Sequence, residues 1–209
     1  MQDEKEPRIA PLLPPAWDDA ILDALGAFPS SLNFVLSRWE AGGVDARGMY
    51  TLGLLAHYPA LAKAFLTLNK HASIDSSVAV RERELLILRT GWLAKADYEF
   101  VQHLILGRRA GLTDDELERI QLGPDAPGWS AEDADVIRVA DDLHFNSCIS
   151  DETWTRISTR FDPRQIMDMI FLVGVYAMLG SAISSFRIPL EPGVAPLAPE
   201  IKARMFESA

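Results

Sequence analysis

Apolar side chains recur at intervals of three and four residues along nearly the whole chain. This spacing places them on one face of an α-helix, whereas a half-buried β-strand repeats its apolar side chains at every second residue. No convincing alternating run and no Asn-Gly hairpin turn interrupts the pattern. The spacing therefore predicts an all-α fold.

Start and stop signals divide the pattern into separate helices. Thr113 and Glu116 form a T-x-x-E pattern, in which each side chain can bond to the other residue's backbone amide at a helix start. Ser130 stands in the same way before an acidic turn. The predicted helices are 17–25, 48–56, 60–72, 79–93, 98–110, 113–121, 131–146, 151–159 and 163–186.

The 209 residues are predicted to form one domain behind a short arm. Four prolines within residues 1–16 are too many for a regular helix, so this segment is predicted to be extended. Residues 17–209 are long enough to bury a core without disulfides or a structural metal. The Gly/Pro-rich loop 122–130 is a candidate hinge, but the composition does not change across it, so a single all-helical domain is expected.

Charge and cysteine content exclude several classes of function. Thirty acidic and twenty basic side chains give a net charge of −10, which repels nucleic acid and anionic membranes. Cys148 is the single cysteine, so no internal disulfide forms, and no Cys/His spacing is typical of zinc. The N-terminus lacks the basic start and apolar run of a secretory signal. We expect a cytoplasmic protein that does not bind nucleic acid.

The segment 169–186 is free of charge over 18 residues, which reaches the length of a membrane-spanning helix. Asp168 and Arg187 bound it closely, and its glycines and serines lower its hydrophobicity. We therefore predict a core helix, or one shared between subunits, and no membrane contact. Together with the apolar run 85–88, this segment predicts a symmetric homo-oligomer.

Glu99 and His103 are the first candidates for chemistry. They are four residues apart in a predicted helix, which places both side chains on one face. A carboxylate beside an imidazole can hold its tautomer and support general acid or base catalysis near neutral pH. An ordinary surface pair is the alternative that this spacing leaves open.

Glu84 lies in the preceding helix beside the apolar run 85–88, where an unpaired carboxylate would be costly. If the two helices form an antiparallel hairpin, Glu84 can meet His103. The alternative is that Glu82 and Glu84 pair with neighbouring arginines on a solvated face.

Three consecutive motifs, RERELLILR, YEFVQH and AGLTDDEL, resemble the carboxymuconolactone decarboxylase family. The similarity extends to PRIAPL, LLAHYPALAKAFL, ISDETW and LVGVYAML, in the order expected for the family. The resemblance implies the AhpD-like helical bundle, assembled as a trimer or a multiple of it. In AhpD-like peroxidases a glutamate, two cysteines and a histidine relay protons to a thiol. Glu84 and His103 match this glutamate and histidine, whereas Ala96 and Glu99 stand at the cysteine positions.

Because the thiol pair is absent, the resemblance favours the decarboxylase branch. It implies a cofactor-free acid/base lyase, acting as a decarboxylase or on lactones, with a small, aromatic-derived carboxylic acid or lactone as substrate. His103 would deliver the proton, and Glu84 and Glu99 would orient and tune it, without a metal ion. The candidate substrate contacts are Arg83 and Arg89, for a carboxylate or an enolate oxygen, and Tyr98, His57 and Tyr176.

Each candidate contact also has a structural interpretation. Both arginines could serve ion pairs, both tyrosines could pack in the core, and His57 could cap a helix end. Trp154 is predicted to pack in the core.

The chain departs from the family where Ala177 follows Tyr176, since a histidine often stands there. This loss motivates a second hypothesis, a non-catalytic protein of the same fold that binds a small ligand or assembles with itself. A third hypothesis is an AhpD-like peroxidase that depends on Cys148. Glu84, Glu99 and His103 could bind a divalent metal ion or form a hydrogen-bonded proton relay. We predict the relay.

Overall fold

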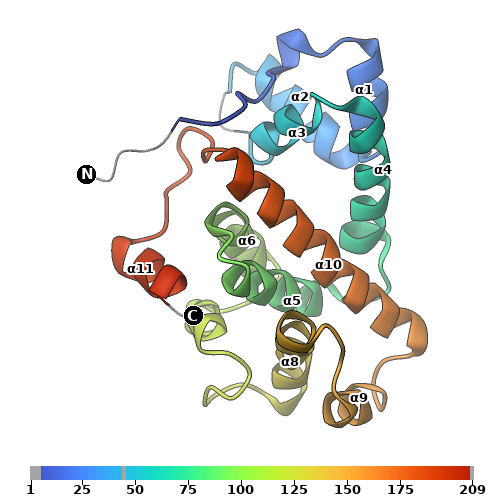
Figure 1. Ribbon diagram of the computed structural model, residues 1–209, viewed down its shortest axis with the longest axis vertical. Coiled ribbons are helices and arrows are strands. Elements are labelled where there is room, and N and C mark those ends of the chain that lie inside the picture. Colours follow the sequence, from blue (N-terminus) through green and yellow to red (C-terminus); the bar gives the residue numbers. More distant parts are fainter. Residues whose placement is uncertain (1–5, 44–45, 208–209) are drawn as a thin grey trace. The chain divides into compact units, whose positions relative to one another are not determined.

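The computed structural model describes residues 6–43 and 46–207, and every regular element in these ranges is helical (Figure 1). The all-α prediction is therefore confirmed for the part of the chain that is described. The elements are η1 (Pro14–Ala16), α1 (Asp19–Leu25), α2 (Pro29–Glu40), α3 (Met49–Leu55), α4 (Pro59–Lys70), the π-helical turn η2 (His71–Asp75), α5 (Val80–Leu93), α6 (Asp97–Arg109), α7 (Asp114–Arg119), η3 (Ile120–Leu122), α8 (Ala131–Asn146), α9 (Asp151–Ile157), α10 (Pro163–Phe186) and α11 (Pro199–Glu207).

Two helices, α2 and α11, were not predicted from the periodicity. Each begins at a proline in its first turn. The fixed φ of proline suits a first helical turn, where its missing N–H costs no hydrogen bond. This start signal was available in the sequence, and α4 and α10 begin in the same way.

The described residues divide into two compact units. The first comprises Met1–His71 and Ala182–Pro196, and the second comprises Ala72–Ser181 and Leu197–Ala209. The predicted arm 1–16 and single domain 17–209 remain predictions. Residues 1–5 of the arm lie outside the described residues, and the arm ends in η1.

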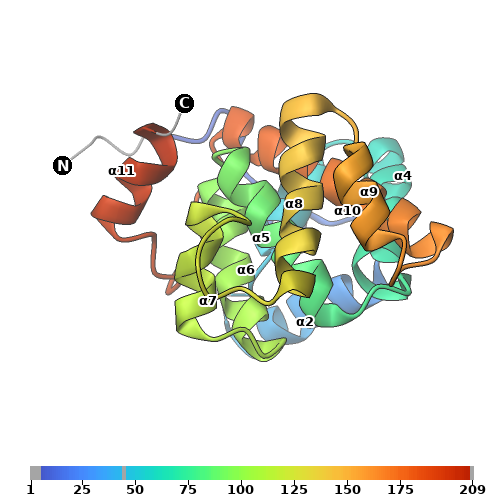
Figure 2. The same ribbon diagram turned by 90° about the horizontal axis from the view of Figure 1, so that it is seen from below.

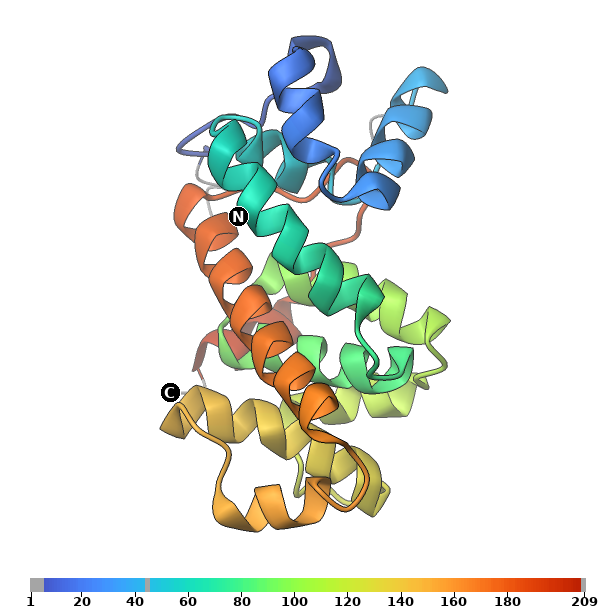
Figure 3. The same ribbon diagram turned by 90° about the vertical axis from the view of Figure 1, so that its right-hand side faces the viewer.

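In the first unit α1 packs against α4, and Figure 3 shows its helices in blue to teal. Buried Glu191 accepts a hydrogen bond from the backbone N–H of Tyr50, at 3.1 Å, in the first turn of α3. The N-cap of α3 is Gly48, which has no side chain to cap the helix. A carboxylate distant in sequence therefore satisfies one of the free amides at this helix start.

In the second unit α5 is the central helix and packs most extensively against α6 and α8 (Figures 1 and 2). All residues from Glu84 to Trp92 are buried. A short turn joins α5 to α6, and Lys95 within it adopts a positive φ of 53°. This tight connection lets α6 fold back along α5.

The helix α10 has the bounds predicted for it. It is the one helix among the described residues that is long and apolar enough to cross a membrane, and half of its most apolar window is buried within the chain. Met169 and Leu172 lie on its buried side, whereas Met167 and Phe171 are exposed. The prediction that a second subunit shares this helix stays a prediction.

The prediction for Trp154 is wrong, because this side chain is 46% exposed on α9. Its neighbour Ile157 is buried instead, so α9 turns Ile157 and not Trp154 toward the core.

Arg81 joins α5 to α7 and α8. Its Nη2 lies 2.6 Å from Glu116 Oε1 and 2.8 Å from Asp133 Oδ2. Glu116 Oε2 also accepts from the backbone N–H of Thr113, which confirms the predicted capping box. The hydrogen bond from Arg81 holds the pKa of the Glu116 carboxyl below its ordinary value.

We predict that Glu116→Gln lowers the free energy of unfolding by about 1–2 kcal/mol at pH 7. Because the folded-state pKa of Glu116 is depressed, its contribution is present above the unfolded pKa, about 4.3, and is lost as pH falls through the folded value. Denaturant unfolding of both proteins at several pH values measures this difference. Glu118→Gln, at an exposed position of the same helix, is the control and should change stability little. A difference that persists unchanged at pH 2 would contradict this account.

Candidate functional site

The site is centred on His103, which lies in the middle of α6. Its Nδ1 is 2.8 Å from Glu84 Oε2 on α5, and both side chains are buried. The hairpin of α5 and α6 thus brings together two residues that are 19 positions apart in the sequence. The hypothesis that Glu84 meets His103 is therefore confirmed. The alternative, in which Glu84 pairs with arginines on a solvated face, is wrong because the side chain is buried.

Glu99 lies on the other side of the imidazole. Its Oε2 is 3.8 Å from His103 Nε2, which is beyond hydrogen-bond distance. Because Nδ1–H donates to Glu84, the neutral ring carries its proton on Nδ1, and Nε2 is the atom able to exchange a proton. Glu99 is therefore the carboxylate that faces this nitrogen.

Tyr176 on α10 forms a further wall of the site. Its ring and that of His103 form an edge-to-face pair with centroids 4.9 Å apart, and its hydroxyl lies 3.2 Å from Ser73 Oγ. Burial raises the pKa of Tyr176 above its ordinary value, and the charges of Glu99 and Glu84 act in the same direction. The phenol therefore stays protonated at neutral pH and can donate a hydrogen bond.

Arg83 lies near the same cluster. Its charge is close enough to Tyr176 to oppose the rise in the phenol pKa. Its Nη1 donates to the Val78 carbonyl at 2.5 Å and more distantly to the Ser76 carbonyl. A substrate contact by Arg83 remains a prediction.

Arg89 is held elsewhere on α5. Its Nε and Nη2 contact Asp141 of α8 at 2.5 and 2.9 Å, and its Nη1 contacts the carbonyls of Ile120 and Gln121. This geometry favours the ion-pair interpretation of Arg89. A substrate contact by Arg89 remains only a prediction.

Tyr98 and His57 are the other two predicted contacts. Tyr98 is buried on α6, and its backbone N–H bonds to Asp97 Oδ1. His57 belongs to the first unit, where its Nε2 lies 2.9 Å from the Ala10 carbonyl. His57 therefore fastens the N-terminal segment within that unit.

Ser73 was missed by the sequence analysis. It lies in η2, a type of turn that often occurs at functional sites. Ser76, which follows η2, donates from Oγ to Asp168 Oδ2 at 3.0 Å. Hydrogen bonds to α10 therefore lie on both sides of Ile74, at Ser73 and at Ser76. No residue pattern predicts such a turn, because it depends on the contact between η2 and α10.

Gly180 lets α10 approach the start of α6. A Cβ atom at this position would lie 2.6 Å from Ala96 Cβ and 4.0 Å from Glu99 Cγ. Ala96 is itself almost fully buried. The absence of a side chain at Gly180 therefore helps to fix the position of Glu99.

Within residues 6–43 and 46–207, no group of three or more His, Cys, Asp or Glu side chains has the arrangement of a metal site. A surface hollow is lined by Asp115, Glu118, Arg119, Leu122, Pro127 and Arg204. None of these residues belongs to the buried cluster around His103.

Comparison with known proteins agrees with this architecture. Residues 59–142 match the carboxymuconolactone decarboxylase family model, and this segment contains Glu84, Glu99 and His103. Over these residues the chain is similar to the carboxymuconolactone decarboxylase family. This family includes enzymes. No curated protein gave a significant match.

Two solved structures share the fold. An uncharacterized peroxidase-related protein from Silicibacter sp. TM1040 is similar over 98% of this chain and 99% of its own, with a TM-score of 0.66 and 18% identity. A protein of unknown function from Agrobacterium tumefaciens, described as a putative antioxidant defence protein AhpD, is similar over 65% of this chain and 93% of its own, with a TM-score of 0.60 and 14% identity. At these identities the likeness establishes the fold alone.

We predict that Gly180→Ala destabilises the protein by about 1–3 kcal/mol. The new Cβ would overlap the Ala96 Cβ, which cannot rotate away, and this cost exceeds the gain in helix propensity of about 1 kcal/mol. Denaturant unfolding measures the change. Gly91→Ala is the matched control, since its Cβ would meet Phe100 at an ordinary 3.6 Å. Equal effects of the two substitutions would show that the close approach at Gly180 has no energetic importance.

Proposed function

We propose that this protein is a cofactor-free acid/base lyase of the carboxymuconolactone decarboxylase type, acting on a small carboxylic acid or lactone. The observation that carries the proposal is the buried imidazole of His103 between Glu84 and Glu99. A proton-exchanging atom in this setting is what general acid catalysis near neutral pH needs.

The proposed reaction begins with a substrate carboxylate held by Arg83. The bond between the carboxylate carbon and the ring breaks, carbon dioxide leaves, and the electron pair moves toward the lactone carbonyl. In this proposal the O–H of Tyr176 stabilises the negative charge on that oxygen. His103, protonated at Nε2, then transfers its proton to the carbon that lost carbon dioxide.

Glu84 and Glu99 have different roles in this proposal. Glu84 holds the Nδ1–H of His103, which fixes the ring orientation and stabilises the imidazolium that donates the proton. Glu99 faces Nε2 across 3.8 Å, and after turnover it can take up a proton from solvent and pass it to Nε2. Lactone processing without loss of carbon dioxide would use the same acid and base.

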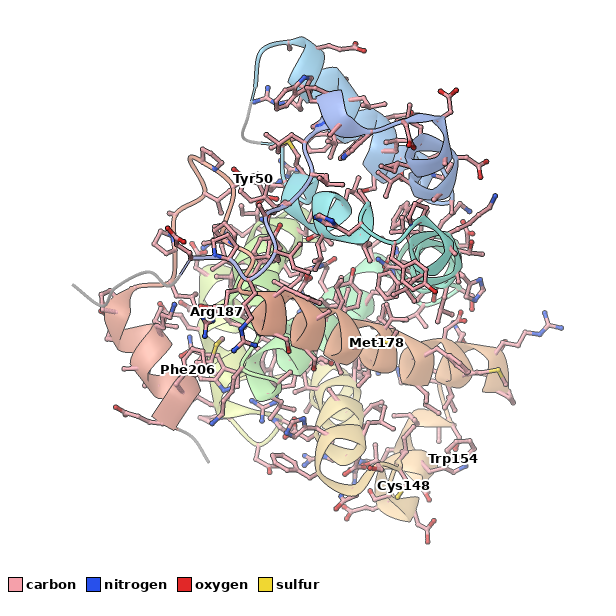
Figure 4. All side chains as sticks on the ribbon, turned by 45° about the horizontal axis from the view of Figure 1, so that its top comes forward. Tyr50, Cys148, Trp154, Met178, Arg187 and Phe206 are labelled. Carbon is pink, nitrogen blue, oxygen red and sulfur yellow. The ribbon has the colours of Figure 1, made fainter. Side chains whose placement is uncertain are left out.

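The peroxidase alternative rests on the names of the two similar structures. A thiol peroxidase needs a reactive thiolate and a group that resolves its oxidised form. Cys148 is exposed at the turn between α8 and α9, where Figure 4 shows it near Trp154. If this alternative holds, Cys148→Ser will abolish peroxide consumption by the purified protein.

We predict that His103→Gln lowers the turnover of carboxymuconolactone or a related lactone acid by on the order of a hundredfold or more. The reason is that an amide cannot supply the proton, although it can keep a hydrogen bond to Glu84. Substrate loss and carbon dioxide release, followed by chromatography, measure the effect. The helical circular dichroism spectrum should not change.

His144→Gln makes the same substitution at an exposed position of α8 and is the matched control, with full activity expected. Equal turnover by His103→Gln and the parent protein would refute the role of His103. If no lactone acid is consumed but one of them raises the melting temperature, the non-catalytic binding protein becomes the better description.

A further inference from the structure

The phenol of Tyr176 has a second hydroxyl beside it, and the proposed reaction leaves that hydroxyl without a role. Tyr176 Oη and Ser73 Oγ are 3.2 Å apart, and either oxygen can be the donor. Tyr176 is 7% exposed, so the pair lies in a buried setting, where a hydrogen bond is electrostatically stronger than in water. Ser73 can therefore act on the phenol directly.

The role proposed for Tyr176 decides which way this hydrogen bond runs. A phenol has one proton, and in the proposed reaction that proton points at the substrate oxygen that gains negative charge. The phenol oxygen then accepts from Ser73, whose hydroxyl rotates to suit its partner. The two hydroxyls thus form a chain of donors that runs from Ser73 through Tyr176 to the substrate.

The surroundings of the phenol weaken it as a donor. Burial raises the pKa of Tyr176, and the charges of Glu99 and Glu84 act in the same direction. The Ser73 hydroxyl and the charge of Arg83 lower this pKa, because both stabilise negative charge on the phenol oxygen. A phenol whose oxygen accepts a hydrogen bond is also polarised into a stronger donor. Ser73 therefore offsets part of the effect of the buried carboxylates.

Ser73 is held in place by more than its bond to Tyr176. The segment 73–77 is fastened to Asp168, which lies eight residues, or about two helical turns, before Tyr176 on α10. Asp168 Oδ2 accepts from Ser76 Oγ at 3.0 Å, from the Ser77 backbone N–H at 3.1 Å and from Ser77 Oγ at 3.3 Å. Neighbouring residues therefore set the position of Ser73 along α10, as is required of a group that orients another.

The same segment contacts Arg83, the arginine proposed to bind the substrate carboxylate. Arg83 Nη1 donates to the carbonyl of Val78 and, at 3.4 Å, to the carbonyl of Ser76. Residues 73–78 thus contact both the proposed carboxylate-binding group and the proposed donor to the oxyanion. An experiment on Ser73 must therefore separate the effect of its hydroxyl from the effect of moving the segment.

We propose that Ser73 is a positioning residue of the candidate site, whose hydroxyl donates to the phenol oxygen of Tyr176 and aims the phenol O–H at the substrate oxygen that gains negative charge. Ser73 acts through Tyr176 and does not itself touch the reacting atoms. The edge-to-face packing of Tyr176 and His103, with ring centroids 4.9 Å apart, keeps this donor beside the proposed acid. This role rests on the proposed function, since it requires Tyr176 to donate to the substrate.

Ionisation of the phenol tests this role without a substrate. A trifluorotyrosine in place of Tyr176 ionises at a lower pH than tyrosine, and fluorine NMR reports on that residue alone. Ser73→Ala removes the hydrogen bond that stabilises the ionised phenol, so we expect its acid dissociation constant to fall about threefold or more. Ser73→Cys, which has a side chain of similar size and a weak donor, should lower the same constant.

Two control variants separate the hydroxyl from the position of the segment. Ser73→Thr keeps a hydroxyl and should retain most of the parent dissociation constant. Ser76→Ala loses the bond to Asp168 but keeps the pair of Ser73 and Tyr176, so it should also retain it. An unchanged constant in both Ser73→Ala and Ser73→Cys, or an equal fall in Ser76→Ala, would overturn the role of Ser73.

Turnover of a lactone acid gives a second readout. Because Ser73 acts through Tyr176, Ser73→Ala should lower kcat by roughly threefold to tenfold and leave KM unchanged. In a Tyr176→Phe background it should cause no further loss, since the phenol is gone. A loss that persists in this background would contradict the role of Ser73. If the parent protein consumes no lactone acid, the proposed function fails, while the fluorine measurement still decides whether Ser73 donates to Tyr176.

Discussion

The structure of the second unit depends on the pairing of two charged side chains that α5 buries. Glu84 and Arg89 are both less than a tenth exposed, and a buried charge without a partner costs several kcal/mol. Glu84 pairs with His103 of α6, and Arg89 pairs with Asp141 of α8. These partners belong to the two helices that contact α5 most extensively, so each pair specifies how a neighbour must lie.

The candidate site follows from one of these pairs. Because Glu84 accepts the hydrogen bond from the Nδ1–H of His103, the other ring nitrogen faces Glu99, and the rings of Tyr176 and His103 pack edge to face. Arg89, like Glu84, borders the apolar run 85–88. Its contacts are with Asp141 and a backbone carbonyl of η3, which hold helices together. Two charged residues five positions apart on one helix thus serve different purposes, since they face different neighbours.

Local sequence signals predicted most of the helices but only part of the site. The capping box at Thr113 and the apolar period of α10 act within one or two turns, so they can be read directly from the chain. Ser73 had no such signal, because its relevance depends on Tyr176, about 100 residues away. Trp154 was misplaced since the period of a two-turn helix does not decide which side faces the core.

The sequence by itself determined the helical class, the resemblance to the carboxymuconolactone decarboxylase family and the candidate acid and base, because these follow from spacing, motif order and residue type. The tertiary structure alone decided which carboxylate touches Nδ1 of His103, that Arg89 pairs with Asp141, and which face of α10 stays exposed. Such facts depend on how helices distant in the chain pack against one another. Periodicity gives each helix an apolar face but does not choose its partner.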